Sequence, residues 1–182
     1  MQFMNLIVIS CSLNSESKSS ALAQFVYREL KDSEYNVEHI VLMGLNLPTC
    51  DGSSCYSNEK VVIVSEKIKK AAGILIATPI YNYDVSAATK NLVELTGKAW
   101  NEKIVGFMCA AGGYGSYMSV MPFANSLMLD YRCTIIPRFV YATSEDFNDN
   151  NIQNQKINER LQELSNDFLH YSKIFGIKKD SR

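Results

Sequence analysis

The segment GILIATPIYNY, residues 73–83, joins a continuous apolar run to a proline and two tyrosines. An apolar run without alternation, here residues 73–78, fits a strand that is covered on both faces. Pro79 ends the run, and the tyrosines follow on either side of an asparagine. Aromatic residues just past a buried strand are either spare core residues or the wall of a site. Taken alone, the segment favours an ordinary helix entry, with Asp84 as the N-cap.

Further apolar runs and helical stripes flank this segment. Strands are predicted at residues 3–9, 37–42, 73–78, 103–110 and 133–136. Apolar residues at helical spacing predict helices at about residues 22–30, 61–71, 85–95, 117–131 and 157–175. The second of these helices opens with β-branched residues, which favour a strand locally, but its apolar stripe and charged opposite face favour a helix. Pro122 lies inside the fourth helix, so that helix should start late or be kinked.

Strands and helices alternate along the whole chain of 182 residues. This alternation predicts one domain, residues 1–182, with a parallel sheet between two layers of helices. In such a sheet, ligands bind beyond the carboxyl ends of the strands. Three loops meet this condition, and they follow Ile9, Thr78 and Ala110. They are therefore the candidate binding loops.

The first loop, residues 10–20, is rich in hydroxyl groups and precedes a helix. Backbone N–H groups and the positive end of the helix dipole favour an anion at such a place. The alternative is a serine-rich helix cap that binds no ligand, and composition leaves both open. The loop matches neither G-x-x-x-x-G-K-[ST] nor G-x-G-x-x-G, so it is neither a triphosphatase loop nor the dinucleotide fingerprint. The side chains that suit a phosphate are Ser10, Ser12, Asn14, Ser15, Ser17, Lys18, Ser19 and Ser20.

The other two loops offer an aromatic wall and an open backbone surface. In the second loop, Tyr81, Asn82 and Tyr83 can line a crevice beyond the strand. The third loop, AAGGYGS at residues 110–116, has three glycines that allow a ligand to approach the backbone closely, although a flexible turn is the alternative. Together the loops fit a flat heterocycle that carries one phosphate, and FMN is the obvious candidate.

These motifs resemble those of the NADPH-dependent FMN reductase family over about residues 5–141. The family's first motif, G-S-L-R-x-x-S-x-N-R, stands here as CSLNSESKSS at residues 11–20, so its glycine, first arginine and asparagine are replaced. The second motif, T-P-E-Y-N, stands as TPIYN at residues 78–82, with only the glutamate replaced. The family's K-N-A-[IL] segment is similar to KNLV at residues 90–93, and its [SA]-G-G segment is similar to AGG at residues 111–113.

The resemblance implies a flavodoxin-like three-layer αβα sandwich, in which five parallel strands have the order 2-1-3-4-5. It implies that the ribityl phosphate of FMN rests on the first loop and that the other two loops frame the isoalloxazine ring. Hydride would pass from NADPH or NADH to FMN and on to a flavin, quinone or similar small acceptor, with no catalytic side chain needed. The candidate cofactor-binding residues are Ser10, Ser12, Asn14, Ser17, Ser19, Ser20, Pro79, Ile80, Tyr81, Asn82, Tyr83, Ala111, Gly112 and Gly113.

The resemblance also implies a homodimer or a higher homo-oligomer. A net charge of -1 provides no basic surface for nucleic acid. No apolar run approaches the roughly 18 residues that span a bilayer. No basic residue precedes the short apolar run at the N-terminus, so a secretory signal is not expected. The chain should therefore be cytoplasmic, with its five cysteines reduced.

Two of the cysteines, Cys50 and Cys55, lie together in a long loop after the second strand. Related iron–sulfur flavoproteins carry four cysteines in this region, and a cluster usually needs four thiolates, so no cluster is expected here. The pair either belongs to a loop that shapes the site or the dimer edge, or forms a redox dithiol without the C-x-x-C spacing. His39 and His170 have no ligand partner nearby in the sequence, so no metal site is expected.

Three other functions remain open on the sequence alone. A one-electron carrier resembling a flavodoxin would share the fold, but flavodoxins tend to be strongly acidic and to use a T/S-x-T-G-x-T loop. A flavin-binding regulatory protein without turnover would share the loops. An iron–sulfur flavoprotein relative that lacks the cluster is the third alternative. Steady oxidation of NADPH in the presence of an acceptor would separate an enzyme from a carrier or a regulator.

Overall fold

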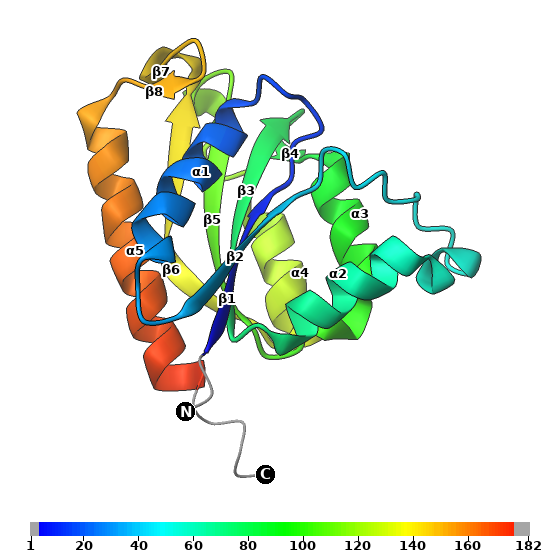
Figure 1. Ribbon diagram of the computed structural model, residues 1–182. Helices are drawn as coiled ribbons and strands as arrows, with labels where there is room; N and C mark the ends of the chain where they lie inside the picture. Colours follow the sequence, from blue (N-terminus) through cyan, green and yellow to red (C-terminus); the bar gives the residue numbers. More distant parts are fainter. Residues whose placement is uncertain (1–3, 177–182) are drawn as a thin grey trace.

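A parallel sheet of long strands is the centre of the computed structural model, which describes residues 4–176 (Figure 1). The sheet order is β2-β1-β3-β5-β6, which confirms the predicted order once the short strand β4 is set aside. Phe3, which the sequence assigns to the first strand, lies outside the described residues. The strands are β1 (Asn5–Ser10), β2 (Asn36–Val41), β3 (Gly73–Tyr81), β4 (Asp84–Val85), β5 (Ile104–Ala111) and β6 (Thr134–Thr143).

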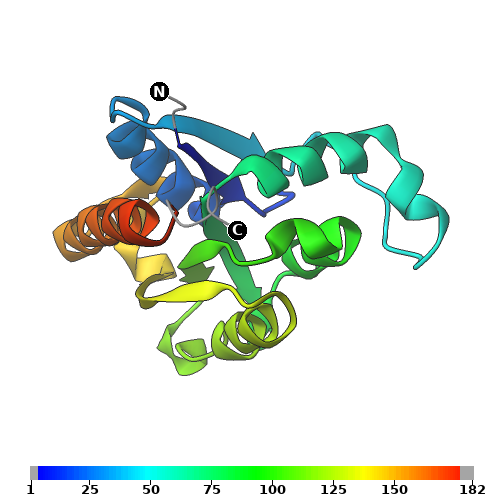
Figure 2. The same ribbon diagram turned by 90° about the horizontal axis from the view of Figure 1, so that it is seen from below.

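Helices cover both faces of the sheet, as the alternation predicts (Figure 2). On β3, Ile74 and Ile76 enter the core of one face, whereas Leu75 and Ala77 enter the core of the other. Both faces of β3 are therefore buried, which explains its continuous apolar run. One face carries α1 (Lys18–Lys31) and α5 (Gln155–Gly176), and the other carries α2 (Glu59–Lys70), α3 (Ala87–Thr96) and α4 (Met121–Tyr131).

The remaining elements are short and lie mostly in the connections. None of the described helices combines the length and apolar character that crossing a membrane requires. The short elements are the 3-10 helices η1 (Ser54–Ser57), η2 (Gly97–Trp100), η3 (Tyr114–Ser116) and η4 (Ser144–Asp146), and the hairpin strands β7 (Phe147–Asn148) and β8 (Asn151–Ile152).

The late start predicted for the fourth helix is confirmed, whereas other predicted boundaries are wrong for local reasons. The helix begins at Met121, so Pro122 falls in its first turn, where no intrahelical hydrogen bond is lost. The alternative N-cap Asp84 belongs to β4 instead, and Ser86 caps α3. The last strand continues past residue 136 because β6 is an edge strand, which tolerates Pro137 in its interior.

Candidate functional site

The carboxyl ends of β1, β3 and β5 lie side by side at one edge of the sheet, at the top of Figure 1. Ser10 at the end of β1 pairs with Ala77, and Pro79 farther along β3 pairs with Ala110. The three predicted loops therefore leave the sheet close together. Their side chains and backbone groups can contact one ligand, as the parallel topology predicts.

The first loop is folded by hydrogen bonds to its own side chains. Ser12 Oγ accepts from Asn14 N at 3.2 Å, and Asn14 Oδ1 accepts from Glu16 N at 3.1 Å. Ser17 caps α1, because its Oγ accepts from Ser20 N at 3.4 Å. Other N–H groups of the first helical turn have no partner within the helix, and the helix dipole makes the potential there positive. The loop is therefore suited to an anion such as a phosphate group.

The predicted serines do not all face the same way. Ser10 is buried and turned toward β2, where its Oγ lies 2.9 Å from Nε2 of His39, and burial lowers the pKa of this histidine. Ser19 is also buried, with its Oγ 2.9 Å from Ser17 Oγ. Ser20 borders a separate hollow between α1 and the β7–β8 hairpin. Ser10 and Ser19 thus stabilise the frame of the loop through hydrogen bonds.

The second loop is a tight hairpin between β3 and β4. Asn82 and Tyr83 connect the strands with φ angles of 50° and 62°, as in a type I′ turn. Ile80 pairs with Val85, and its side chain is buried in the core, so only its backbone is left for a ligand. Tyr81 and Tyr83 are 57% and 70% exposed. The hairpin therefore presents two tyrosine rings at the edge of the sheet.

A buried network of hydroxyl groups fixes this hairpin to the start of α3. Thr78 Oγ1 lies 2.7 Å from Thr89 Oγ1, which lies 2.9 Å from Ser86 Oγ. Ser86 N also donates to Thr78 Oγ1 at 3.4 Å. The three side chains are buried. Because buried hydroxyl groups without partners are costly, the network favours a single position of the hairpin relative to the helix.

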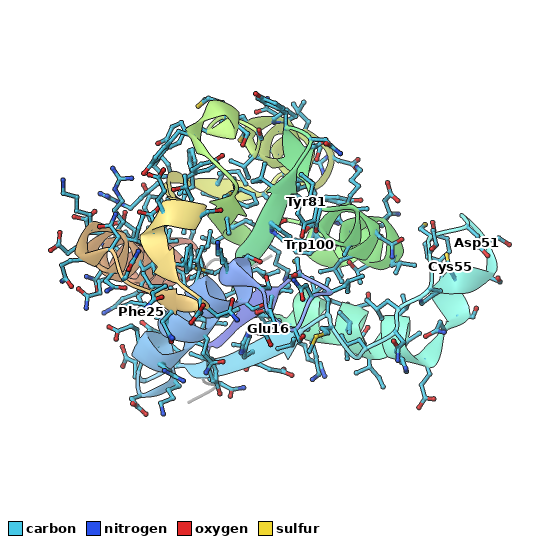
Figure 3. All side chains as sticks on the ribbon, turned by 90° about the horizontal axis from the view of Figure 1, so that it is seen from above. Glu16, Phe25, Asp51, Cys55, Tyr81 and Trp100 are labelled. Atoms are coloured by element: carbon cyan, nitrogen blue, oxygen red, sulfur yellow. The ribbon has the colours of Figure 1, made fainter. Side chains whose placement is uncertain are left out.

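A groove of about 350 Å³ separates the first loop from the second. Ser12 and Asn14 border it on one side, and Pro79 and Tyr81 border it on the other (Figure 3 labels Tyr81). A larger hollow of about 660 Å³ adjoins it, between the first loop, the β2–α2 connection and α3. The two share the residues Leu13, Ala87 and Ala88. Both volumes are in the range of sites for small molecules.

The third loop has a backbone that the rest of the protein leaves open. An added Cβ at Gly112 or Gly113 would meet no atom within 4 Å, and neither residue has a positive φ. Neither packing nor backbone conformation therefore requires glycine here. Tyr141 on β6 holds the loop in place, since its hydroxyl donates to Gly113 O at 2.8 Å and lies 2.5 Å from Ser116 Oγ. Ala111, the residue before the glycines, is the buried end of β5.

Aromatic side chains connect the second and third loops. The hydroxyl of Tyr83 lies 3.3 Å from the position that a Cβ on Gly115 would take, so the two loops are in contact. The ring of Tyr114, which is 61% exposed, lies 6.4 Å from that of Tyr141, and the ring of Tyr117 lies 5.3 Å from it. The open glycine backbone is therefore bordered by exposed aromatic rings.

The site contains no activated thiol. Burial raises the pKa of the Cys11 thiol, at the start of the first loop, to about 12, and it raises the pKa of Cys109 on β5 to about 12 as well. Both thiols are therefore protonated near neutral pH. Within residues 4–176, no group of three or more His, Cys, Asp or Glu side chains is arranged to hold a metal ion.

Several residues that shape the site were not predicted. Tyr141 was missed because the last strand was predicted to end at residue 136, whereas β6 extends to the edge where the loops lie. Thr89 and Ser116 were missed because the partners of their hydroxyl groups, Thr78 and Tyr141, are distant in the sequence. The one signal in the sequence was that Tyr141 would lie near the carboxyl end of the last predicted strand if that strand were longer.

FMN binds beyond the carboxyl ends of the strands in flavodoxin-like sheets. The same edge of this protein presents a helix start suited to an anion, two exposed tyrosine rings and an open glycine backbone. Solved structures share this fold. An NADH:FMN oxidoreductase (EMOB, apo form) matches with a TM-score of 0.75 and 16% identity, over 98% of this chain and 94% of that one. The flavoenzyme FerB, an NAD(P)H:(acceptor) oxidoreductase from Paracoccus denitrificans, matches with a TM-score of 0.75 and 19% identity, over 94% and 98%.

The family model for NADPH-dependent FMN reductases matches residues 4–148, so the chain belongs to that family. A curated relative from Geobacillus thermodenitrificans (strain NG80-2), an NAD(P)H-dependent FAD/FMN reductase, is 28% identical over 172 residues, which are 92% of each chain. The resemblance noted in the sequence is thereby confirmed. The protein is an NAD(P)H-dependent flavin reductase, and its cofactors are FMN and a nicotinamide nucleotide.

The type I′ turn gives a direct test of the hairpin geometry. A left-handed φ at a residue other than glycine costs on the order of 1 kcal/mol, so Tyr83→Gly should leave the free energy of unfolding unchanged or raise it by about 0.5–1 kcal/mol. The matched control is Tyr81→Gly, within the β3–β4 pairing, which should lower it by about 0.5–1 kcal/mol. Urea denaturation of both variants measures the difference. A larger loss for Tyr83→Gly than for Tyr81→Gly would contradict the turn assignment.

Proposed function

We propose that FMN binds across the three loops, with its phosphate on the first loop and its ring between the second and third. The observation that carries this placement is the pair Gly112 and Gly113, where a Cβ would meet no protein atom. Glycine is required there neither by the fold nor by the backbone conformation, so close approach of a ligand accounts for it. When bound, FMN supplies the acceptor for a hydride from the nicotinamide.

The phosphate is proposed to lie at the start of α1. The first-turn N–H groups and the helix dipole favour an anion there, and Ser12, Asn14, Ser17 and Ser20 surround the loop with polar atoms. Ser10 and Ser19 support the loop from within the protein. Lys18 is the first residue of the same helix, and its ammonium lies 5.8 Å from the ring centroid of Phe147 on β7.

The isoalloxazine ring is proposed to lie against the hairpin and the glycine loop. Pro79, Tyr81, Asn82 and Tyr83 form one wall, to which Ile80 contributes backbone atoms only. The backbone of Gly112 and Gly113, which follows Ala111 at the end of β5, would form the other wall. Their N–H groups could donate to a ring oxygen that carries negative charge, and such fixed dipoles stabilise charge effectively in a water-poor site. No side-chain acid, base or nucleophile is assigned.

The larger hollow beside the groove is proposed to receive the nicotinamide nucleotide or the final acceptor. It lies between α3 and the β2–α2 connection and adjoins the groove through Leu13. Flavins, quinones and similar small aromatic molecules are the proposed acceptors, because flat rings can stack on the exposed tyrosines. The chain, as a single domain of residues 1–182, would act in the cytoplasm, a compartment whose thiol reductants favour free cysteines.

The decisive experiment is the absorption spectrum of the purified chain with FMN, followed by addition of NADPH or NADH. We expect tight FMN binding, bleaching of the flavin absorbance and then steady NAD(P)H oxidation when free flavin or a quinone is present. Bleaching without steady turnover would favour an electron carrier. Failure to bind FMN would contradict the proposed site.

Gly112 provides a test that separates binding from stability. Because space is open at this position, Gly112→Val should change the free energy of unfolding of the apoprotein by less than about 0.5 kcal/mol and weaken FMN binding at least about tenfold. Gly106 on β5 is the matched control, since an added Cβ would lie 2.6 Å from Leu75 Cδ2. Gly106→Ala should therefore destabilise the fold by about 1–3 kcal/mol. Unchanged FMN affinity in Gly112→Val, by fluorescence titration, would count against the placement.

The protein is further proposed to be a homodimer. Large apolar side chains are exposed beside the third loop and on α4, including Met118 at 59% and Leu129 at 85%, and such surfaces commonly mark contacts between subunits. Light scattering should give about twice the chain mass of 20.5 kDa, and Leu129→Glu should shift the equilibrium toward the monomer. A wild-type protein that is purely monomeric at micromolar concentration would contradict the dimer.

A further inference from the structure

The two cysteines of the β2–α2 connection lie together at the tip of a segment that projects from the sheet. Figure 3 places Asp51 and Cys55 there, far from Tyr81. Cys50 Sγ and Cys55 Sγ are 3.9 Å apart. The sulfurs of a disulfide are about 2.05 Å apart, so a small movement within one loop would join these two. The proposed flavin site does not use either thiol.

Hydrogen bonds hold the two cysteines in this arrangement from both sides. Asp51 Oδ1 accepts from the backbone N–H of Cys55 at 3.1 Å and from that of Ser53 at 2.8 Å. On the other side, the N–H of Cys50 donates to Asn91 Oδ1 on α3 at 2.8 Å. The backbone on each side of the sulfur pair is therefore anchored before any reaction occurs.

The two thiols have different surroundings. Cys50 is partly exposed, and its Sγ lies 3.6 Å from the hydroxyl of Tyr56. Hydrogen bonding from Tyr56 is the main cause that lowers the pKa of Cys50, and the smaller opposing causes are desolvation and the charge of Glu94. Cys55 is buried against Val61, and this burial is the main cause that raises its pKa. Its thiol donates to Cys50 Sγ. Cys50 is therefore the more accessible and the more readily ionised of the two thiols, and the Cys55 thiol lies behind it.

We propose that Cys50 and Cys55 form a peroxide-reactive dithiol that closes to a reversible intramolecular disulfide. Cys50 is the attacking thiol because it is partly exposed and receives hydrogen bonds. Cys55 is the resolving thiol because it is buried within reach of the Cys50 sulfur. The other cysteines of the chain, Cys11, Cys109 and Cys133, are buried elsewhere in the core and do not take part.

The reaction with hydrogen peroxide balances in two steps. The Cys50 thiolate attacks one peroxide oxygen, the O–O bond breaks, and the departing hydroxide is protonated to water, which leaves a sulfenic acid on Cys50. The Cys55 sulfur then attacks the Cys50 sulfur. An S–S bond forms, the S–O bond breaks, and the oxygen leaves as water with the Cys55 proton. The two sulfurs lose two electrons, which the peroxide gains. A small dithiol reductant reverses the change by thiol–disulfide exchange.

The test treats the purified full-length chain with an equimolar amount of hydrogen peroxide, followed by alkylation, digestion and mass spectrometry. We expect a Cys50–Cys55 linked peptide that has lost two hydrogens and that a dithiol reductant returns to the reduced form. In Cys55→Ser, dimedone should label Cys50 as the trapped sulfenic acid. In Cys50→Ser, Cys55 should stay reduced. Circular dichroism melting of both variants checks that they are folded.

Tyr56 allows a test of the hydrogen bond to Cys50 that is separate from the distance between the two sulfurs. Tyr56→Phe removes the hydroxyl beside Cys50 and should slow the peroxide reaction about three- to tenfold at neutral pH, because less thiolate is present. Tyr35→Phe, at the opposite end of β2, is the matched control and should leave the rate unchanged.

The proposal is overturned if both thiols remain alkylatable after peroxide, or if a disulfide forms only between chains. It is also overturned if wild-type Cys50 proceeds to the sulfinic acid instead. None of these outcomes depends on flavin binding.

Discussion

Parallel pairing of β3 between β1 and β5 is the constraint on which the rest of the structure depends. A parallel strand cannot be followed by a tight turn to its neighbour, so each connection must cross over the sheet. The crossovers place α1 and α5 on one face and α2, α3 and α4 on the other. As a result, β3 is apolar along residues 73–77, and every strand of the parallel set ends at the same edge. The location of the site follows from this pairing before any particular side chain is considered.

The loops at that edge are held by anchors from neighbouring elements. The hydroxyl network of Thr78, Ser86 and Thr89 attaches the hairpin to α3. Tyr141 reaches from β6 to the carbonyl of Gly113. Because the anchors are built into the protein, little ordering of the loops is needed when a ligand binds, and such preorganisation favours affinity.

Apolar runs predicted the strands and the three loops, because strands that are buried on two faces are apolar without alternation. The sheet order came from the family resemblance. The sequence predicted less well which side chains are accessible to a ligand. Ile80 occupies the position of the family's glutamate and was expected to contact the cofactor, yet its side chain is buried in the core beside the pairing with Val85. Ser10 and Ser19 have the right chemistry, but both are turned inward. Tyr141 was missed because the last strand was predicted to end at residue 136, whereas β6 continues through Pro137 to Thr143. Composition records which residues are polar, whereas tertiary pairing decides where each one points.

The exposed tyrosine rings at the edge of the sheet differ from the buried anchors in how much their replacement affects folding. Tyr81, Tyr83 and Tyr114 are each more than half exposed, whereas the hydroxyl groups that position their loops are buried behind them. Exchanging an exposed ring costs little folding energy compared with exchanging a buried anchor. The frame and the loop tips that carry these rings can therefore vary almost independently. Under the proposed placement of FMN, the range of acceptors could then change over evolutionary time while the position of the flavin is retained.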